Sequence, residues 1–538
     1  MSGRQISRNS GSQECFQWAE KHIVNCVKEH KACADQSSAT RRLPTRILDL
    51  QCFNGSDDLR LYDSHGGETD PYATLSHCWG TAGRPLTTAK ATIDSRLERI
   101  RFGDLSRSFQ DAVTISRALK IRYLWIDTLC IIQDSIEDWA TESAQMARIY
   151  KSSHLTISFT DYKDSHQPIF CDRPQLPTCK MGREMPNIYI RSIFPSSEQE
   201  PSKILERSDT ILGNLSCLGH RAWAFQERLL SPRVLSYTRD QLIWECRDVV
   251  EHESMVVVEN PYMNMPDPKS EKKDVYRFWL HLVESFSQCA LTYSGDLFPT
   301  LSGIASETMA LLDDAYIAGM WKADLHVALL WRPAEYGSAV DKYRAPSWSW
   351  ASLHGNIKYD NLREGFMGEN QTCHYPHDRD VQVLDHHVHL TTSDPLGMIN
   401  EASLKVGAYC APAESVAQAS GSKSVEAIDI VPVPQPGKDS LALVDWKFDT
   451  QRTPSPSHRY VLMQVSRWAL KRKVALINVD DDSDSEISLS DKMEVPYIGT
   501  LILEEAEKAG EYRRVGHAKI RLEHRGKILW QQRELVLI

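Results

Sequence analysis

Short apolar runs alternate with amphipathic segments between residues 72 and 159, and this alternation is the clearest pattern in the chain. The runs 72–78, 122–127 and 154–159 are apolar and β-prone, and each predicts a buried strand. Residues 106–119 and 135–150 instead repeat apolar positions at helical spacing. The order strand, helix, strand, helix, strand predicts a parallel sheet with right-handed crossovers. We therefore expect an α/β domain.

The rest of the chain is less regular, and its pattern divides it into further segments. Residues 221–246 predict one helix followed by two strands, which we assign to the same α/β domain. The expected organisation is a helical N-terminal segment at 1–60, an α/β domain at 72–246 with an irregular insertion at about 161–215, a helical segment at 275–335 and a mostly β region at 344–538. Within the last region, residues 411–440 predict a linker and the acidic run 480–486 predicts a solvated loop.

The N-terminal helix, expected from about residue 15 to 33, carries four side chains that bind metals elsewhere. His22, Cys26, His30 and Cys33 fall on one face of a continuous helix. The outer two would then lie about 16 Å apart, because each helical residue rises by ~1.5 Å. Zinc ligands must instead lie within about 2.0–2.3 Å of one ion. At most a neighbouring pair of these side chains could bind a metal with help from elsewhere in the chain, so we expect core or surface packing here and no metal site.

Composition and charge exclude several classes of protein. Apolar residues make up 41% of the chain and charged residues 25%, as in folded globular proteins. The 62 basic and 72 acidic residues leave a net charge of −10, which argues against a nucleic-acid partner. No apolar run reaches the ~18 residues of a membrane span, and the 13 cysteines form no CxxC motif. These features predict a soluble protein of the cytoplasm, with the nucleus as the alternative compartment.

Three acidic residues face the expected core. Glu142 lies on the apolar face of the 135–150 helix, and Glu227 lies four residues after Trp223 on the 221–230 helix. Asp127 ends a buried strand, where α/β sheets place their ligands. A buried carboxylate must be paired, neutralised or placed at a cleft. Structural ion pairs and a functional site both fit this pattern.

Several long motifs carry a resemblance to a known family. They are, in order, YATLSHCWG at 72–80, LWIDTLCIIQD at 124–134, MARIY at 146–150 and RAWAFQERLLSPR at 221–233. Together they strongly resemble the fungal heterokaryon-incompatibility (HET) domain. The blocks QLIWEC at 241–246 and RAPSWSWAS at 344–352 resemble segments found beyond that domain in many members.

The resemblance implies a role in fungal non-self recognition, in which the domain triggers programmed death of fused cells. The expected partners are a second copy of the chain or other incompatibility proteins. HET domains are also distantly similar to Toll/interleukin-1 receptor (TIR) domains, which implies a flavodoxin-like open parallel sheet. A paralogue without a death role is a further alternative.

Some TIR domains cleave NAD with a single glutamate, which makes NAD glycohydrolase the alternative function. The resemblance then implies NAD as the substrate and requires no bound cofactor. We expect Glu142 to be the catalytic carboxylate, with Asp127 and Ser76 on the opposite wall of the cleft. Trp79, Gly80 and Gln133 are the residues expected to bind the nucleotide.

Overall fold

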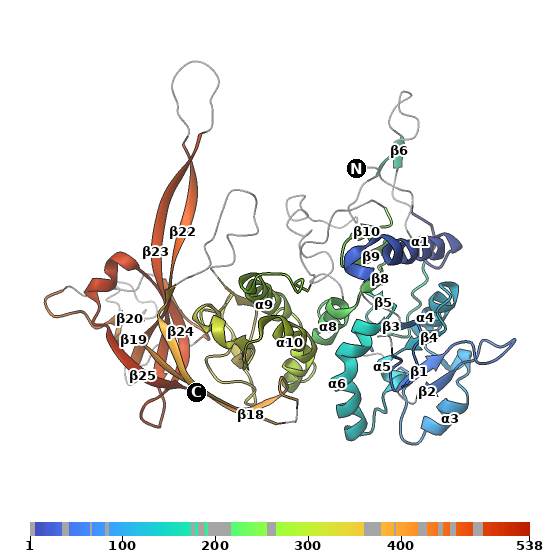
Figure 1. Cartoon of the computed structure of the whole chain (residues 1–538), viewed down its shortest axis with the longest axis horizontal. Helices are drawn as coiled ribbons and strands as arrows, with labels where there is room; N and C mark the ends of the chain where they lie inside the picture. Colours follow the sequence, from blue (N-terminus) through green and yellow to red (C-terminus); the bar gives the residue numbers. More distant parts are fainter. Residues whose placement is uncertain are drawn as a thin grey trace, which may run out of the picture. The chain divides into compact units, whose positions relative to one another are not determined.

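The computed structural model describes most of the chain in two compact units. The described residues are 6–34, 42–64, 67–80, 85–173, 178–180, 189–191, 217–254, 265–359, 378–391, 394–417, 428–438, 445–451, 459–476 and 488–538. The first unit comprises Met1–Met265 with Pro299–Ile304, and the second comprises Pro266–Phe298 with Ala305–Ile538. Each unit is described by itself below (Figure 1).

The first unit is an α/β domain built on an eight-stranded sheet. Its helices are α1 (Gln13–Glu29), α2 (Lys31–Ala34), α3 (Ile93–Glu98), α4 (Arg107–Ala118), α5 (Asp127–Cys130), α6 (Ile136–Ser152) and α8 (Ala222–Leu230). Its sheet strands are β1 (Arg46–Asp49), β2 (Arg60–Asp63), β3 (Tyr72–Ser76), β4 (Tyr123–Trp125), β5 (Leu155–Phe159), β8 (Arg233–Tyr237), β9 (Leu242–Cys246) and β10 (Val250–His252). A separate hairpin joins β6 (Thr178–Lys180) to β7 (Tyr189–Arg191).

Four strands at the centre of the large sheet are parallel. They lie in the order β4-β3-β5-β8, which is second, first, third, fourth along the chain. This is the strand order of flavodoxin-like sheets. The three strands expected at 72–78, 122–127 and 154–159 lie side by side, so the predicted α/β class is confirmed. All residues of β3, β4 and β5 are buried, because crossover helices cover the sheet. Figure 1 shows α4 and α6 on opposite sides of the strands.

Antiparallel strands extend the sheet at both edges. The sequence pattern did not predict β1 and β2, which form one of these edges. β1 pairs with β4 and with β2, so residues 46–49 and 60–63 join the sheet. The assignment of residues 1–60 to a helical segment is therefore wrong for its last part. The strand at 46–49 has only four residues, which is too short for its alternation to stand out.

The helices pack their apolar faces onto one hydrophobic core. Trp125 is fully buried in the sheet, and the ring of Tyr150 on α6 packs edge-on against it. Met146 and Ile149 of the same helix belong to the same core. The beginning of the same helix does not follow the expected arc, since Trp139 is 39% exposed. Trp79 and Trp223 are partly buried. The apolar face of α6 is therefore formed by its last three turns.

The second unit combines helices with a β-rich region, as expected. Its elements are α9 (Lys272–Phe286), α10 (Pro299–Leu312, whose first residues belong to the first unit), α11 (Leu325–Ala328), β11 (Tyr316–Ile317), β12 (Met320–Trp321), β13 (Arg332–Pro333), β14 (Ser338–Ala339), β15 (Leu353–His354), β16 (Ile357–Lys358), β17 (Asp378–Arg379), β18 (Val381–Leu390), β19 (Ile399–Ala417), β20 (Ile428–Pro432), β21 (Asp445–Phe448), β22 (Tyr460–Leu476), β23 (Ser488–Glu505), β24 (Glu511–Arg521) and β25 (Gln531–Leu537). Strands β22, β23, β24, β25 and β19 pair in a closed ring around an apolar core.

Some segments expected to be irregular differ from that expectation or lie outside the described residues. Much of 411–440 is not a linker, because β19 runs to Ala417 and β20 pairs with it. Most of the insertion at about 161–215 and the whole acidic run 480–486 lie outside the described residues. Among the helices that the structure describes, none is both long enough and apolar enough to cross a membrane.

Candidate functional site at the carboxyl edge of the parallel strands

A buried glutamate lies at the end of the first parallel strand. Glu227 is in α8, which packs against α6 and against β3. Its carboxylate accepts a hydrogen bond from the hydroxyl of Ser76, the last residue of β3. The hydroxyl of Tyr150 lies within hydrogen-bonding reach of this carboxyl group and of the carbonyl oxygen of Leu75, at 3.0 Å, and donates its single proton to one of them at a time. Strand, helix and tyrosine thus hold one carboxyl group at the sheet edge where α/β proteins bind ligands.

Asp127 is the second carboxylate of this region and follows the neighbouring strand β4. The indole Nε1 of Trp79 donates to its Oδ2 at 2.8 Å, and the backbone N–H of Thr128 donates to its Oδ1 at 2.7 Å. The Nδ1 of His77 lies 4.0 Å from the same carboxylate. Arg221 donates to the carbonyl oxygen of His77 at 2.5 Å. We call Ser76, His77, Trp79, Asp127, Tyr150, Arg221 and Glu227 the strand-edge cluster.

Burial sets the protonation of this cluster. It raises the pKa of Glu227 from 4.5 to about 7; the Ser76 hydrogen bond opposes the rise, the charge of Asp127 adds to it, and Arg221 opposes it. Burial also lowers the pKa of His77 to about 4, so the imidazole is neutral at pH 7. A carboxyl group with a pKa near 7 both accepts and releases protons at physiological pH, as acid–base catalysts do.

Of the residues expected to bind the nucleotide, Trp79 belongs to this cluster and Gly80 and Gln133 lie beside it. Gln133 donates from its side-chain amide to the carbonyl oxygens of Asp127 and Ile131, each at 3.1 Å. Gly80 has a φ of +90°, and a Cβ there would lie 2.8 Å from the side chain of Asp164. Only glycine fits this backbone conformation without strain. Trp79, Gly80 and Gln133 are partly exposed, so the cluster reaches solvent on their side.

Glu142 lies in a different environment from the one expected. Its carboxylate is 3.8 Å from the guanidinium of Arg46, and it is hydrogen-bonded to Thr45. The same guanidinium makes two hydrogen bonds to Asp138, at 2.6 and 2.7 Å. Burial raises the pKa of Glu142, while Thr45 and Arg46 lower it. Ser76 and Asp127, expected to face Glu142, belong to the strand-edge cluster around Glu227 instead.

The sequence pattern predicted only part of the environment of Glu227. Its spacing from Trp223 placed it on an inward face, but nothing along the chain showed that Ser76 and Tyr150 would meet it. Those contacts depend on how α8 packs against the sheet, which is a tertiary feature. Glu142 shows the same inward-facing spacing in the sequence, but its carboxylate lies beside Arg46.

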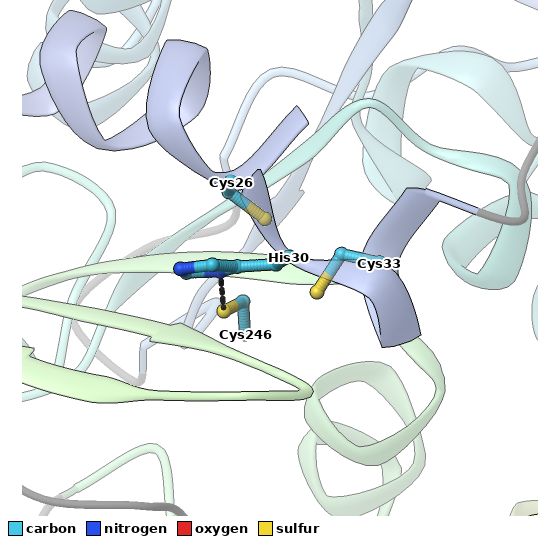
Figure 2. A group of neighbouring side chains, drawn as sticks. All are labelled: Cys26, His30, Cys33 and Cys246. Carbon is cyan, nitrogen blue, oxygen red and sulfur yellow. Dashed lines mark hydrogen bonds between the residues drawn. The ribbon is translucent and has the colours of Figure 1, made fainter. Parts of the chain in front are cut away.

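A second group of side chains comes together away from the sheet edge. Ligand atoms of Cys26, His30, Cys33 and Cys246 all lie within 4.8 Å of one another (Figure 2). The expectation of no metal site assumed a continuous helix from residue 15 to 33. That premise is wrong, because α1 ends at Glu29 and the chain turns before α2.

Comparisons with known proteins identify the domain that contains the strand-edge cluster. Residues 72–227 match the family model described as "Heterokaryon incompatibility protein (HET)". A search of curated proteins and a search of solved structures found no match. The chain thus carries a HET domain, and every residue of the strand-edge cluster lies within it.

Proposed function

We propose that this chain, which carries a HET domain, is an effector of heterokaryon incompatibility that triggers cell death through its strand-edge cluster. The observation that carries the proposal is the buried Glu227 carboxyl group with a pKa near 7 at the carboxyl edge of the parallel strands. A desolvated carboxyl group costs folding free energy. Perturbed acids of this kind concentrate at functional sites.

The chemistry of the cluster favours cleavage of a glycosidic bond to a cationic leaving group as the reaction. In NAD, the bond between ribose C1 and the nicotinamide nitrogen breaks, and its electron pair neutralises the pyridinium. The ribose carbon then carries oxocarbenium-like positive charge, which a nearby carboxylate stabilises. Water adds to that carbon and passes its proton to the carboxylate. This NAD glycohydrolase activity is the second candidate function, with Glu227 in the role expected of Glu142.

The electrostatics of the cluster suit such a substrate. A pyridinium cation beside Glu227 favours the ionised carboxylate, because an opposite charge lowers the pKa of an acid. Ser76 orients one carboxylate oxygen, and Asp127 adds a second negative charge on the partly exposed side. Trp79 and Gly80 border that side, where an aromatic face and a bare backbone are suited to hold a nucleotide.

Expression in a fungal host tests the death role with a matched pair of variants. The wild-type chain, Glu227→Gln and Glu142→Gln are induced from the same promoter, and protein abundance is followed by immunoblot. We expect growth arrest with the wild type and with Glu142→Gln, and normal growth with Glu227→Gln at equal abundance. The proposal fails if Glu227→Gln kills as well as the wild type, or if none of the three proteins kills.

Nicotinamide release tests the reaction directly. Purified full-length protein is incubated with NAD, and nicotinamide is quantified by chromatography. The wild type and Glu142→Gln should release nicotinamide, while Glu227→Gln should lose at least about 100-fold in rate, as expected for removal of a catalytic carboxylate. Killing that depends on Glu227 without any nicotinamide release would exclude the glycohydrolase and keep the death role.

A further inference from the structure

Four metal-binding side chains from separate elements converge in the first unit. Cys26 lies in α1, His30 follows that helix as its C-cap, Cys33 lies in α2 and Cys246 is the last residue of β9. Their ligand atoms lie within 4.8 Å of one another, and Figure 2 shows the three sulfur atoms gathered around the His30 ring. We propose that these residues, the Cys3His cluster, bind one zinc ion that fixes the N-terminal helices to the sheet.

The chain turn at His30 brings the first three ligands together. The backbone of His30 is extended, with φ −90° and ψ 106°, so α1 stops there. The N–H of Cys33 then bonds to the carbonyl oxygen of His30 at 3.1 Å, which folds the following residues back. Cys33 therefore approaches Cys26, although a straight helix would separate them by about 10 Å. His22 does not join, because its ring packs between Trp18 and Trp244.

The distances between the four ligand atoms suit tetrahedral coordination of one ion. Zinc–sulfur bonds of about 2.3 Å and zinc–nitrogen bonds of about 2.0–2.1 Å place sulfur about 3.6 Å from nitrogen and about 3.8 Å from another sulfur. The Nδ1 of His30 lies 3.3 Å from the sulfur of Cys246. No pair in the Cys3His cluster exceeds the tetrahedral edge by more than about 1 Å, which side-chain rotation closes. Three cysteines and one histidine form a known ligand set of closed, structural zinc sites.

A buried arginine supplies the charge that such a site requires. Arg233 is 1% exposed, and its Nε donates to the sulfur of Cys26 at 3.2 Å. Its other contacts among the described residues are the carbonyl oxygens of His154 and Cys33, and no carboxylate pairs with it there. A buried cation without a neighbouring anion is strongly destabilising. Zinc with three thiolates carries a net charge of −1, which neutralises Arg233.

Backbone N–H groups point at two of the sulfur atoms. The N–H of Arg247 bonds to the sulfur of Cys33, and that of Val249 bonds to the sulfur of Cys246. Hydrogen bonds of this kind orient and stabilise metal-bound ligands. The Cys3His cluster thus has four ligands, a counter-charge and supporting donors, most of them buried.

The position of the cluster indicates its role. All four ligands lie outside residues 72–227, the segment that matches the HET family model. Three come from the N-terminal helices and one from β9, which lies beyond the four parallel strands. One ion therefore ties a segment that precedes the HET domain to a strand that follows it. The zinc site therefore has a structural role, and this proposal does not depend on the proposed function.

Metal analysis of the full-length protein tests the site without any variant. The chain is produced in zinc-supplemented medium and purified without chelator under reducing conditions. Its zinc content is measured by inductively coupled plasma mass spectrometry. We expect about one zinc per chain. A second batch from cobalt-supplemented medium should show thiolate-to-cobalt charge-transfer absorption and the visible bands of tetrahedral cobalt. A folded chain with no bound metal, or with a disulfide between two of the cluster cysteines, would overturn the proposal.

Matched cysteine variants assign the metal to these residues. Cys246→Ser removes one ligand, and Cys130→Ser changes an equally buried cysteine of the same unit that lies outside the cluster. Zinc content should fall well below half with the first variant and stay unchanged with the second. Chelator should also lower the melting temperature of the wild type. Zinc that stays with Cys246→Ser would show that the ion binds elsewhere. If Cys246→Ser does not fold, the cobalt spectrum of the wild type decides the ligand set.

Discussion

The two inward-facing glutamates of the HET domain share a local sequence pattern but have different partners. Glu142 on α6 meets Arg46, whereas Glu227 on α8 meets the hydroxyl groups of Ser76 and Tyr150. Burial raises the pKa of both carboxyl groups, and Thr45 and Arg46 oppose the rise at Glu142. At Glu227, burial and the charge of Asp127 bring the pKa to about 7 although Ser76 and Arg221 oppose them. The nearest partner, and not burial alone, therefore separates a structural carboxylate from a candidate catalytic one.

Removing the arginine from the first environment should have the largest effect on stability. In Arg46→Met, Asp138 and the buried Glu142 lose their counter-charge. Breaking a buried ion pair in this way lowers the free energy of unfolding by about 3–5 kcal/mol. Chemical denaturation at pH 7, followed by tryptophan fluorescence, measures the change. Arg99→Met, which breaks the exposed pair with Asp58, should cost much less.

A loss in Arg46→Met as small as that in the Arg99 control would contradict the ion-pair reading. Arg46 would then not distinguish Glu142 from Glu227, and the contrast between the two glutamates would disappear.

The pH dependence of stability should distinguish Glu227 by about 3 kcal/mol. Its carboxyl pKa rises from 4.5 in the unfolded chain to about 7 in the fold, so the folded state holds the proton more tightly between these values. Stability due to this group is therefore present at pH 4 and lost as the pH rises toward 8. Glu227→Gln removes this loss, so its stability relative to the wild type should improve by about 3 kcal/mol from pH 4 to pH 8. Denaturant titrations across that range measure it, and parallel curves for the two proteins would refute the shifted pKa.

The hydrogen bond between Trp79 and Asp127 should contribute a smaller amount. Trp79→Phe keeps an aromatic ring but removes the N–H donor of a charged hydrogen bond. We expect a loss of about 2 kcal/mol in the free energy of unfolding. Trp139→Phe, at an exposed position on α6, should change stability by less than about 0.5 kcal/mol. Equal effects of the two substitutions would show that the Asp127 contact does not hold the strand-edge cluster together.

The smallest effect is expected for Glu142→Gln. Glutamine keeps the shape and the contact with Thr45, and Arg46 retains its two hydrogen bonds to Asp138. The lost attraction to Arg46 is offset by the smaller cost of burying a neutral group, so we expect a change below about 1 kcal/mol at pH 7. Equilibrium denaturation measures it. A loss above about 3 kcal/mol would make Arg46–Glu142 the dominant pair of this region.

Local sequence determined the central elements of the α/β domain. Apolar runs at 72–78, 122–127 and 154–159 predicted β3, β4 and β5, because an apolar run between turn residues has few alternatives to a buried strand. The helical spacing of apolar residues at 135–150 predicted α6, and the hydroxyl of Ser135 accepts the N–H of Asp138 as its N-cap. Long motifs also identified the HET domain, which the family model matches at residues 72–227. These features depend on neighbours in the chain, so the sequence alone sufficed.

Tertiary packing decided which side chains meet. Ser76 and Glu227 are 151 positions apart, and Cys26 and Cys246 are 220 apart by their numbering, so no spacing rule relates them. Periodicity places both Glu142 on α6 and Glu227 on α8 on inward faces. It therefore could not show which of the two carboxylates lies at the edge of the parallel strands. The expectation of no metal site assumed a continuous helix, but the chain turns at His30, where the backbone is extended and α1 ends. This turn brings Cys33 close to Cys26. Side-chain chemistry is written in the sequence, but the distances that turn it into a site exist only once helices and strands have packed.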